Sequence, residues 1–188
     1  MAKLTSDFFT RDPVACAREL IGCIFHWKGC TGCIVETEAY HSVDDAACHT
    51  FFKPSVRTFV AQHDPGDAYV YLNYGVHWLF NIVIKGSSGE GFVLLRALEP
   101  VDGIDEMISR RGKMKVQGLA NGPGKLTRAL GIDSRANGTR FLEKPDCGIF
   151  TGEAREISTG TRIGISKATE LPWRFGQKNS RFLSRTFS

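Results

Sequence analysis

The sequence predicts an α+β fold, a single domain with a mainly antiparallel, curved sheet flanked by helices. Apolar runs of strand length follow one another through the middle of the chain, and turns rich in glycine separate them. Helical patterns stand before and after these runs. Strands in succession with helices to the side are typical of α+β domains, whereas parallel sheets alternate strand and helix. The 188 residues, 1–188, are expected to form one domain around one core.

The first two predicted elements are a helix and a β-hairpin. Asp12 suits the N-cap of the helix, Pro13 its first position and Gly22 the position after its end. Apolar side chains between them recur at helical spacing. Residues 23–27 and 33–40 then indicate two strands joined by a turn that contains Lys-Gly.

The middle of the chain predicts a three-stranded meander. Its strands are residues 69–74, 78–84 and 92–98. Gly75 marks a tight turn between the first two strands, and residues 85–91 form a turn rich in glycine and serine. Along each strand, alternate side chains are expected on opposite faces of the sheet.

The later part of the chain predicts two helices and one more strand. One helix is capped near Asp102, and a second spans residues 125–130 and stops at Gly131. Residues 162–165 are expected to form a late core strand. Residues 184–188 are expected to fray.

Composition indicates a globular protein inside the cell. Hydrophobic residues make up 42% of the chain and charged residues 23%, which excludes the disordered class. No apolar run approaches the roughly 20 residues of a membrane span, and the first residues lack the apolar stretch of a signal peptide. Cys30 and Cys33 form a C-x-x-C pair, but no second pair completes a zinc site. We therefore expect thiols and no metal.

Charge is distributed unevenly along the chain. Residues 36–67 carry six acidic against two basic side chains, a net charge of −4. Residues 110–140 carry eight basic against one acidic, a net of +7, and residues 155–188 carry seven against two, a net of +5. This pattern fits a polyanion-binding surface around a site that bears carboxylates. A solvated basic face without a partner explains the charge equally well.

The strand over residues 33–40 carries chemically capable side chains on one face. Glu36, Glu38 and Tyr40 alternate onto the same side of the strand. Two carboxylates and an aromatic ring are unusual for a packed core. Either this face meets solvent, or at least one carboxylate has a function.

The meander places further polar groups at unusual positions. Tyr74 and His77 occupy a hairpin tip, where an exposed aromatic side chain often marks a contact site. Asn81 interrupts an apolar strand, so its amide needs a hydrogen-bond partner. That partner is either the neighbouring strand or a ligand.

Several blocks of sequence together resemble a known family, the alkyladenine DNA glycosylases (the mammalian type of 3-methyladenine DNA glycosylase). In order along the chain, these blocks are residues 34–40 followed by His49, 69–82, 94–100, 122–126 and 162–165. The resemblance implies a monofunctional glycosylase that flips a damaged purine out of duplex DNA and hydrolyses its bond to the sugar. An abasic site remains, and base excision repair begins. The expected substrates are alkylated or deaminated purines of the 3-methyladenine, 7-methylguanine and hypoxanthine class.

The resemblance also implies roles for individual residues. Glu38 matches the general base that activates water, Arg96 helps to hold this water, and Ile163 contributes a backbone carbonyl to it. Tyr40, His49 and Tyr71 match the rings that stack on the flipped base, and electron-rich rings attract a cationic alkylpurine. Asn81 matches the residue that clashes with the 2-amino group of guanine. In that family such a clash excludes normal guanine.

The implied DNA contacts lie outside the base pocket. Tyr74 matches the side chain that fills the gap left by the flipped nucleotide. Beside it, Val76 and His77 stand where mammalian members carry methionine and tyrosine, which leaves the depth of this wedge open. A phosphate contact is expected from the following residues: Gly122, Gly124 and Lys125.

The resemblance implies that the partner is double-stranded DNA containing damaged purines. We expect a monomer without cofactor, metal or membrane association, cytoplasmic and close to the nucleoid in a bacterium, or nuclear in a eukaryote. Two other classes remain open. One is a nucleic-acid-binding module in which Glu38 is structural, and the other is a hydrolase of free nucleosides.

Overall fold

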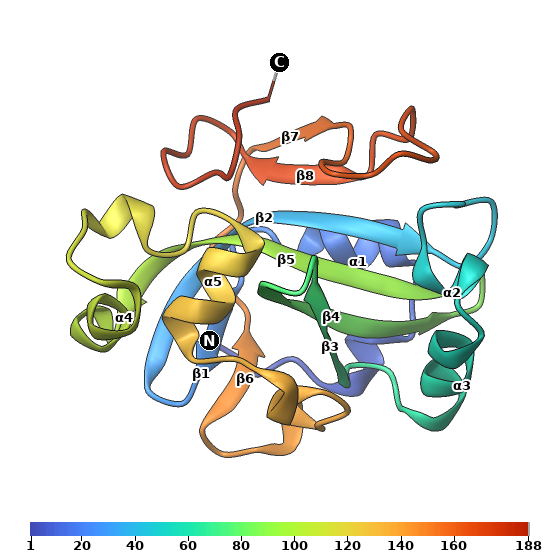
Figure 1. The fold of residues 1–188 in the computed structure, drawn as a ribbon, viewed down its shortest axis with the longest axis horizontal. Coiled ribbons are helices and arrows are strands. Elements are labelled where there is room, and N and C mark those ends of the chain that lie inside the picture. The colour runs from blue at the N-terminus through green and yellow to red at the C-terminus, as the bar shows by residue number, and fades with distance from the viewer. Residues whose placement is uncertain (188) are drawn as a thin grey trace.

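The computed structural model describes residues 1–187 and confirms the α+β prediction. One eight-stranded sheet, in which every paired neighbour is antiparallel, forms the centre of the molecule (Figure 1). Its strands are β1 (Ile24–Trp27), β2 (Cys30–His41), β3 (Ala68–Asn73), β4 (His77–Gly86), β5 (Gly89–Asp102), β6 (Cys147–Phe150), β7 (Ile157–Gly160) and β8 (Arg174–Gln177). The α-helices are α1 (Pro13–Glu19), α2 (His49–Phe52), α3 (Pro54–Gln62), α4 (Ile104–Arg111) and α5 (Pro123–Leu130).

Strand β2 organises the sheet. The strand order is β3-β4-β5-β2-β1-β6, and β8 pairs with both β2 and β7. Strand β1 pairs with the first residues of β2, whereas β8 pairs with the later segment from Glu36 to Glu38. The two strands therefore divide one edge of β2 between them, while β5 covers the other edge.

The predicted first helix and hairpin are confirmed. Asp12 caps α1, because its Oδ1 accepts hydrogen bonds from the N–H groups of Val14 and Ala15 at 2.8 and 2.9 Å. Pro13 is the first helical residue. The helix ends at Glu19, earlier than predicted, and Gly22 lies in the following turn with φ of +90°. In Figure 1, α1 lies behind β2 and β5.

The predicted meander is β3, β4 and β5. Tyr74 and Gly75 both adopt positive φ, +50° and +69°, at the tip between β3 and β4. The second turn is shorter than predicted, because Gly86 pairs with Gly89 and the strands extend to these residues. Alternate side chains separate by face: Tyr69, Tyr71 and Asn81 are among the residues that line a cavity, while their neighbours Val70, Phe80 and Ile82 lie in the core.

The core contains a cluster of aromatic rings on the face opposite this cavity. Phe25, Trp27, Phe80 and Phe141 pack with ring centroids between 5.2 and 6.2 Å apart. All four side chains are buried, and such packing contributes beyond the burial of apolar area. No helix in residues 1–187 is long and apolar enough to cross a membrane.

The predictions for the later part of the chain are partly confirmed. Helix α4 follows Asp102, whose Oδ1 accepts from the N–H of the N-cap residue Gly103 at 2.8 Å. Helix α5 begins at Pro123, two residues earlier than predicted, and ends at Gly131 in the left-handed conformation. Strands β6, β7 and β8 and helices α2 and α3 were not among the predicted elements.

Two predictions for the C-terminal part are wrong. Residues 162–165 form no strand, because the Arg162 side chain turns inward and donates to the carbonyls of Ala39 and Ala168 at 3.0 and 3.1 Å. The segment after β8 is not frayed at Ser184, whose N–H donates to the buried Glu36 at 2.6 Å. Ser188, the last residue of the predicted frayed end, lies outside the described residues.

Candidate active site

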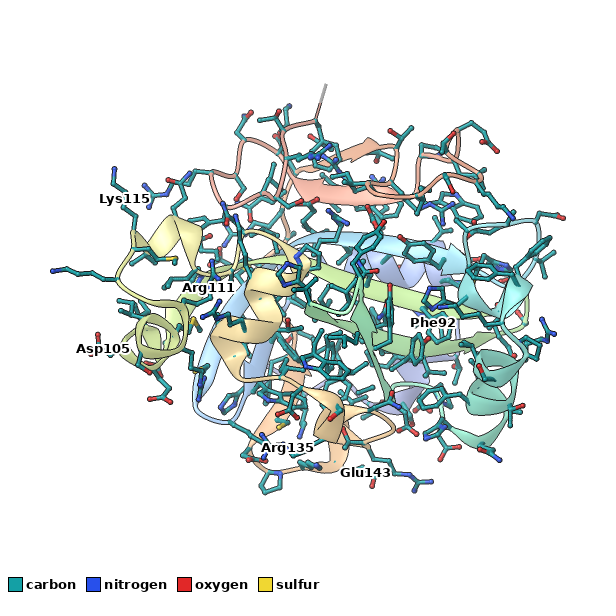
Figure 2. All side chains as sticks on the ribbon, viewed as in Figure 1. Phe92, Asp105, Arg111, Lys115, Arg135 and Glu143 are labelled. Carbon is teal, nitrogen blue, oxygen red and sulfur yellow. The ribbon has the colours of Figure 1, made fainter. Side chains whose placement is uncertain are left out.

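A cavity of about 540 Å³ opens on one face of the sheet. Strands β2 to β5 form its floor, the residues around α2 form one wall, and the loop after Arg162 forms another. The predicted residues that line it are Tyr40, His49, Tyr71, Tyr74, Asn81, Arg96 and Ile163. Phe92 also lines it, and Figure 2 shows this ring near the α2 end of the sheet. The fold thus brings together residues that are up to 123 positions apart.

Glu38 lies beneath this cavity and is fully buried. Its Oε1 accepts a hydrogen bond from the Ile163 N–H at 2.7 Å and lies 3.1 Å from Arg96 Nη1. Its Oε2 accepts from the Tyr40 hydroxyl at 2.8 Å. Burial raises the pKa of Glu38, although the Arg96 cation and the Ile163 and Tyr40 donors oppose this rise. The three donors therefore keep the charged form accessible in a buried position.

Neither carboxylate of the β2 face meets solvent, so the first alternative raised by the sequence is wrong. Glu36 is also fully buried, and its Oε1 lies 3.0 Å from Arg96 Nε. Register shifts between β2 and β5 occur on both sides of Glu36. Arg96 thus bridges the two carboxylates. Burial lowers the pKa of Arg96, but the Glu38 and Glu36 carboxylates together raise it by more. The pKa therefore lies above its usual value, and this side chain stays cationic.

The aromatic part of the cavity contains a neutral histidine. The His49 ring lies 4.6 Å from the Tyr71 ring, centroid to centroid. Its Nδ1 is 2.9 Å from the Tyr69 hydroxyl and its Nε2 is 3.4 Å from Lys53 Nζ. Because an ammonium group can only donate, Nε2 accepts and Nδ1 carries the proton. Burial and the Lys53 cation lower the pKa of His49 to about 4.

The structure shows the cross-strand partner of Asn81, while a contact with a ligand stays a prediction. The Asn81 side chain is 4% exposed and lines the cavity. At the same time its Nδ2 donates across the sheet to the Tyr69 carbonyl at 3.2 Å. That bond fixes the amide at the floor of the cavity.

The hairpin tip projects from the molecule. Tyr74 is 84% exposed and Val76 is 68% exposed, both large apolar side chains in water. His77 is also exposed and lies against α5, where a Cβ on Gly124 would be 2.8 Å from the histidine Cβ. Gly124 therefore lets the tip and α5 approach each other.

The residues predicted to contact phosphate lie close to this tip. Gly122 is the N-cap residue of α5, and Lys125 is exposed in its first turn. The Lys125 ammonium donates to Asn121 Oδ1 at 3.0 Å. The phosphate contact stays a prediction.

The C-x-x-C pair consists of buried free thiols. Cys30 Sγ contacts the Gly103 carbonyl at 3.7 Å and Arg110 Nη1 at 3.4 Å. Burial raises the pKa of the Cys33 thiol to about 11. Within residues 1–187, no cluster of His, Cys, Asp and Glu has the composition of a metal site.

Comparison with known proteins identifies the family. The sequence model of the methylpurine-DNA glycosylase family matches residues 7–181. The chain belongs to this family. Relatives from Rhodopseudomonas palustris (strain CGA009) and Bradyrhizobium diazoefficiens are each 46% identical, and the alignments cover 98% of this chain and 89% and 92% of theirs. A relative from Agrobacterium fabrum is 44% identical over 98% of this chain and 94% of its own. All three carry the provisional name 3-methyladenine DNA glycosylase.

The match confirms the resemblance drawn from the sequence. As a DNA glycosylase, the protein is a hydrolase of N-glycosyl bonds and a DNA-repair enzyme. DNA is accordingly its substrate.

Sequence reasoning missed an ion pair that supports the glycosylase pocket. Arg162 Nη1 and Nη2 lie 2.6 and 2.8 Å from the two Asp45 oxygens, and both side chains are fully buried. The Arg162 guanidinium also lies 4.7 Å from the centre of the Tyr40 ring. The pair thus anchors the loop after Arg162 and supports Tyr40. The only sequence signals for this pair are the acidic charge of residues 36–67 and the position of Arg162 at the start of a family block.

The basic segment 110–140 of this glycosylase is only partly available to DNA. Arg110 and Arg111 donate to the carbonyls of Ala129 and Leu119 and so hold α4 in place. The exposed lysines of the segment are Lys113, Lys115 and Lys125. Figure 2 shows Lys115 and Arg135 well apart, Lys115 near α4 and Arg135 at the lower edge of the view.

Proposed function

We propose that this glycosylase excises alkylated and deaminated purines that are flipped out of duplex DNA, and leaves an abasic site. The substrate class is 3-methyladenine, 7-methylguanine and hypoxanthine. One observation carries the proposal: the buried Glu38 carboxylate lies under an aromatic cavity, between the Arg96 guanidinium and the Ile163 amide.

Glu38 is the proposed general base. It takes a proton from water while the water oxygen attacks the anomeric carbon, and the bond between that carbon and the purine nitrogen breaks. Arg96 orients the carboxylate and the water. Ile163 acts through its N–H, which binds Glu38 Oε1, and through the carbonyl proposed to hold the water. An N-alkylated purine leaves as a neutral base, so it requires little acid assistance. Hypoxanthine is uncharged before cleavage and must take up a proton from solvent as it leaves.

The cavity suits a flipped purine. A volume of about 540 Å³ lies within the usual range for small-ligand sites. Tyr40, His49 and Tyr71 are the proposed stacking partners, and the neutral His49 does not repel a cationic alkylpurine. Asn81 is the proposed barrier to the 2-amino group of guanine.

The exposed hairpin tip is the proposed wedge. Extrusion of a nucleotide costs a few kcal/mol, and a side chain that fills the gap offsets part of this cost. Tyr74 is 84% exposed, with the exposed Val76 and His77 beside it. Lys125, with Gly122 and Gly124, is the proposed phosphate contact near this tip. We further propose that the enzyme acts on DNA as a monomer, in the cytoplasm of a bacterium.

The test is release of free base from labelled duplexes that carry a single hypoxanthine or a single 3-methyladenine. Wild type is compared with Glu38→Gln, and Glu90→Gln on the exposed end of β5 is the matched control. We expect release by wild type and control, and a loss of about 10²–10⁴-fold in Glu38→Gln, the usual contribution of one acid–base group.

Three outcomes would contradict the proposal. Equal activity of Glu38→Gln and wild type would remove Glu38 as the base. Binding of either duplex by folded wild-type protein without base release would indicate a binding module, and release from free nucleosides alone would indicate a nucleosidase.

A further inference from the structure

Glu36 is the second buried carboxylate of β2. Like Glu38, it is not among the residues that line the cavity, but several donors hold it. Glu36 Oε1 accepts from the Ser184 hydroxyl at 2.7 Å and from Arg96 Nε at 3.0 Å. Its Oε2 accepts from the Ser184 N–H at 2.6 Å. A carboxylate removed from water persists only where donors and cations replace its hydration. Ser184 supplies two of these donors.

Arg96 is divided between the two carboxylates. Its Nε contacts Glu36 at 3.0 Å, its Nη2 donates to the Ser184 hydroxyl at 3.2 Å, and its Nη1 contacts Glu38 at 3.1 Å. A guanidinium is a rigid planar fork, so two fixed nitrogens determine where the third points. The Glu36–Ser184 pair therefore sets the direction of the Nη1 group toward Glu38.

The segment that carries Ser184 is itself fixed to the sheet. Arg174 Nη2 donates to the carbonyls of Arg185 and Thr186 at 3.1 and 3.2 Å. The Arg174 guanidinium lies 3.9 Å from the centre of the Phe187 ring, and Phe182 is buried. Arg174 Nε also lies 3.6 Å from Glu36 Oε1. The C-terminal segment and the two carboxylates thus form one connected network.

We infer that Glu36 and Ser184 are positioning residues of the active site, which orient Arg96 toward the proposed base Glu38. The inference rests on the proposed function, because it concerns how the base of that reaction is held. Without the Ser184 donors, Glu36 remains a poorly compensated buried anion and draws Arg96 toward itself. The ion pair between Arg96 and Glu38 is then weaker.

The charges around Glu38 determine in which direction its pKa should shift in each variant. The groups that face it from the surrounding elements are Glu36, Tyr40, Tyr71, Arg96, Arg162 and Arg174. Burial raises the pKa of Glu38, the Arg96 cation lowers it, and the Glu36 anion raises it. Weakening the hold on Arg96 and removing the Glu36 charge should therefore shift the pKa of Glu38 in opposite directions.

The experiment is single-turnover release of hypoxanthine from a duplex across a range of pH. Ser184→Ala removes a donor to Glu36, and Glu36→Gln removes the charge at nearly constant shape. Ser180→Ala is the matched control, because Ser180 Oγ accepts from the Phe182 N–H within the same segment. We expect the acid limb of Ser184→Ala to move to higher pH by about half a unit, with a rate on the plateau reduced about ten-fold.

In Glu36→Gln we expect the acid limb to move to lower pH, and in Ser180→Ala we expect the wild-type profile. Unmoved acid limbs in folded Ser184→Ala and Glu36→Gln would overturn the inference, even if both plateau rates fell, because a merely structural role lowers rates without that shift. If Glu36→Gln does not fold, Ser184→Ala decides alone. No release by the wild type at any pH would refute the proposed function and this inference with it.

Discussion

The Tyr40 hydroxyl donates a hydrogen bond of 2.8 Å to Oε2 of Glu38, so one side chain both lines the base cavity and binds the buried carboxylate beneath it. The two residues are two positions apart on β2 and therefore lie on the same face. The proposed stacking on a base and the observed hydrogen bond to the carboxylate thus belong to a single tyrosine.

Tyr40→Phe should separate these two effects. The ring remains for stacking, but Glu38 loses a donor that lowers its pKa, so its pKa should rise. A base is active only when deprotonated, and we expect the acid limb of base release to move to higher pH. A pH profile of single-turnover release measures this shift. Tyr71→Phe is the control, because its hydroxyl is not among the donors to Glu38 found in residues 1–187; equal shifts in both variants would contradict the prediction.

The lowered pKa of His49 predicts a pH dependence of folding stability. The unfolded histidine titrates near 6.5 and the folded one near 4, so between these values the unfolded state binds more protons. The free energy of unfolding should therefore fall as pH decreases from 6.5 to 4, and this part of the slope should be absent in His49→Asn. Urea denaturation at several pH values tests this. A slope unchanged in His49→Asn would show that His49 does not titrate as described.

The buried ion pair of Arg162 and Asp45 should be costly to break. Asp45→Asn leaves the Arg162 guanidinium buried without its charge partner, and we expect a loss of about 3–5 kcal/mol in the free energy of unfolding. Base release should also decline, since the pair anchors the cavity loop. The exposed pair of Arg135 and Asp133 provides the control, because Arg135→Ala removes a solvent-screened contact and should cost far less stability. Similar losses in both variants, measured by denaturant titration, would argue against a special role for the buried pair.

Asn81 should determine discrimination against guanine. Asn81→Ser shortens the side chain at the cavity floor, and we expect release of normal guanine from an undamaged duplex to become detectable. Chromatography of the released bases is the measurement. Asn73→Ser, which changes an amide elsewhere in the cavity lining, should not have this effect. Guanine release that stays at the wild-type level in Asn81→Ser would remove the proposed steric role.

Local signals in the sequence were sufficient for much of the fold. The cap at Asp12, the alternation along β2 and the glycine between β3 and β4 all act over a few residues, and the elements that depend on them were predicted. The same alternation placed Glu38 and Tyr40 on one face, which is where the structure has them. The family resemblance then named the cavity residues that the fold brings together.

The features that sequence reasoning missed depend on distant partners. The Arg162 side chain is held by Asp45, 117 positions earlier, in a loop where a strand was predicted. Ser184 is held in place because its N–H and hydroxyl donate to the buried carboxylate of Glu36, 148 positions earlier. Strand β8 is four residues long and joins the sheet by pairing with β2, more than 130 positions earlier, and with the equally short β7. The sequence pattern within one segment does not predict such contacts.

The division of one β2 edge between β1 and β8 has a consequence for biosynthesis. Strand β1 is made early, but the segment around Glu36 and Glu38 stays without its edge partner until Arg174 to Gln177 have left the ribosome. Contacts of such long sequence separation form slowly, because the intervening chain must first be ordered. The edge of β2 at Glu36 to Glu38 therefore gains its partner strand only late in synthesis, and Glu36 gains the Ser184 donors later still.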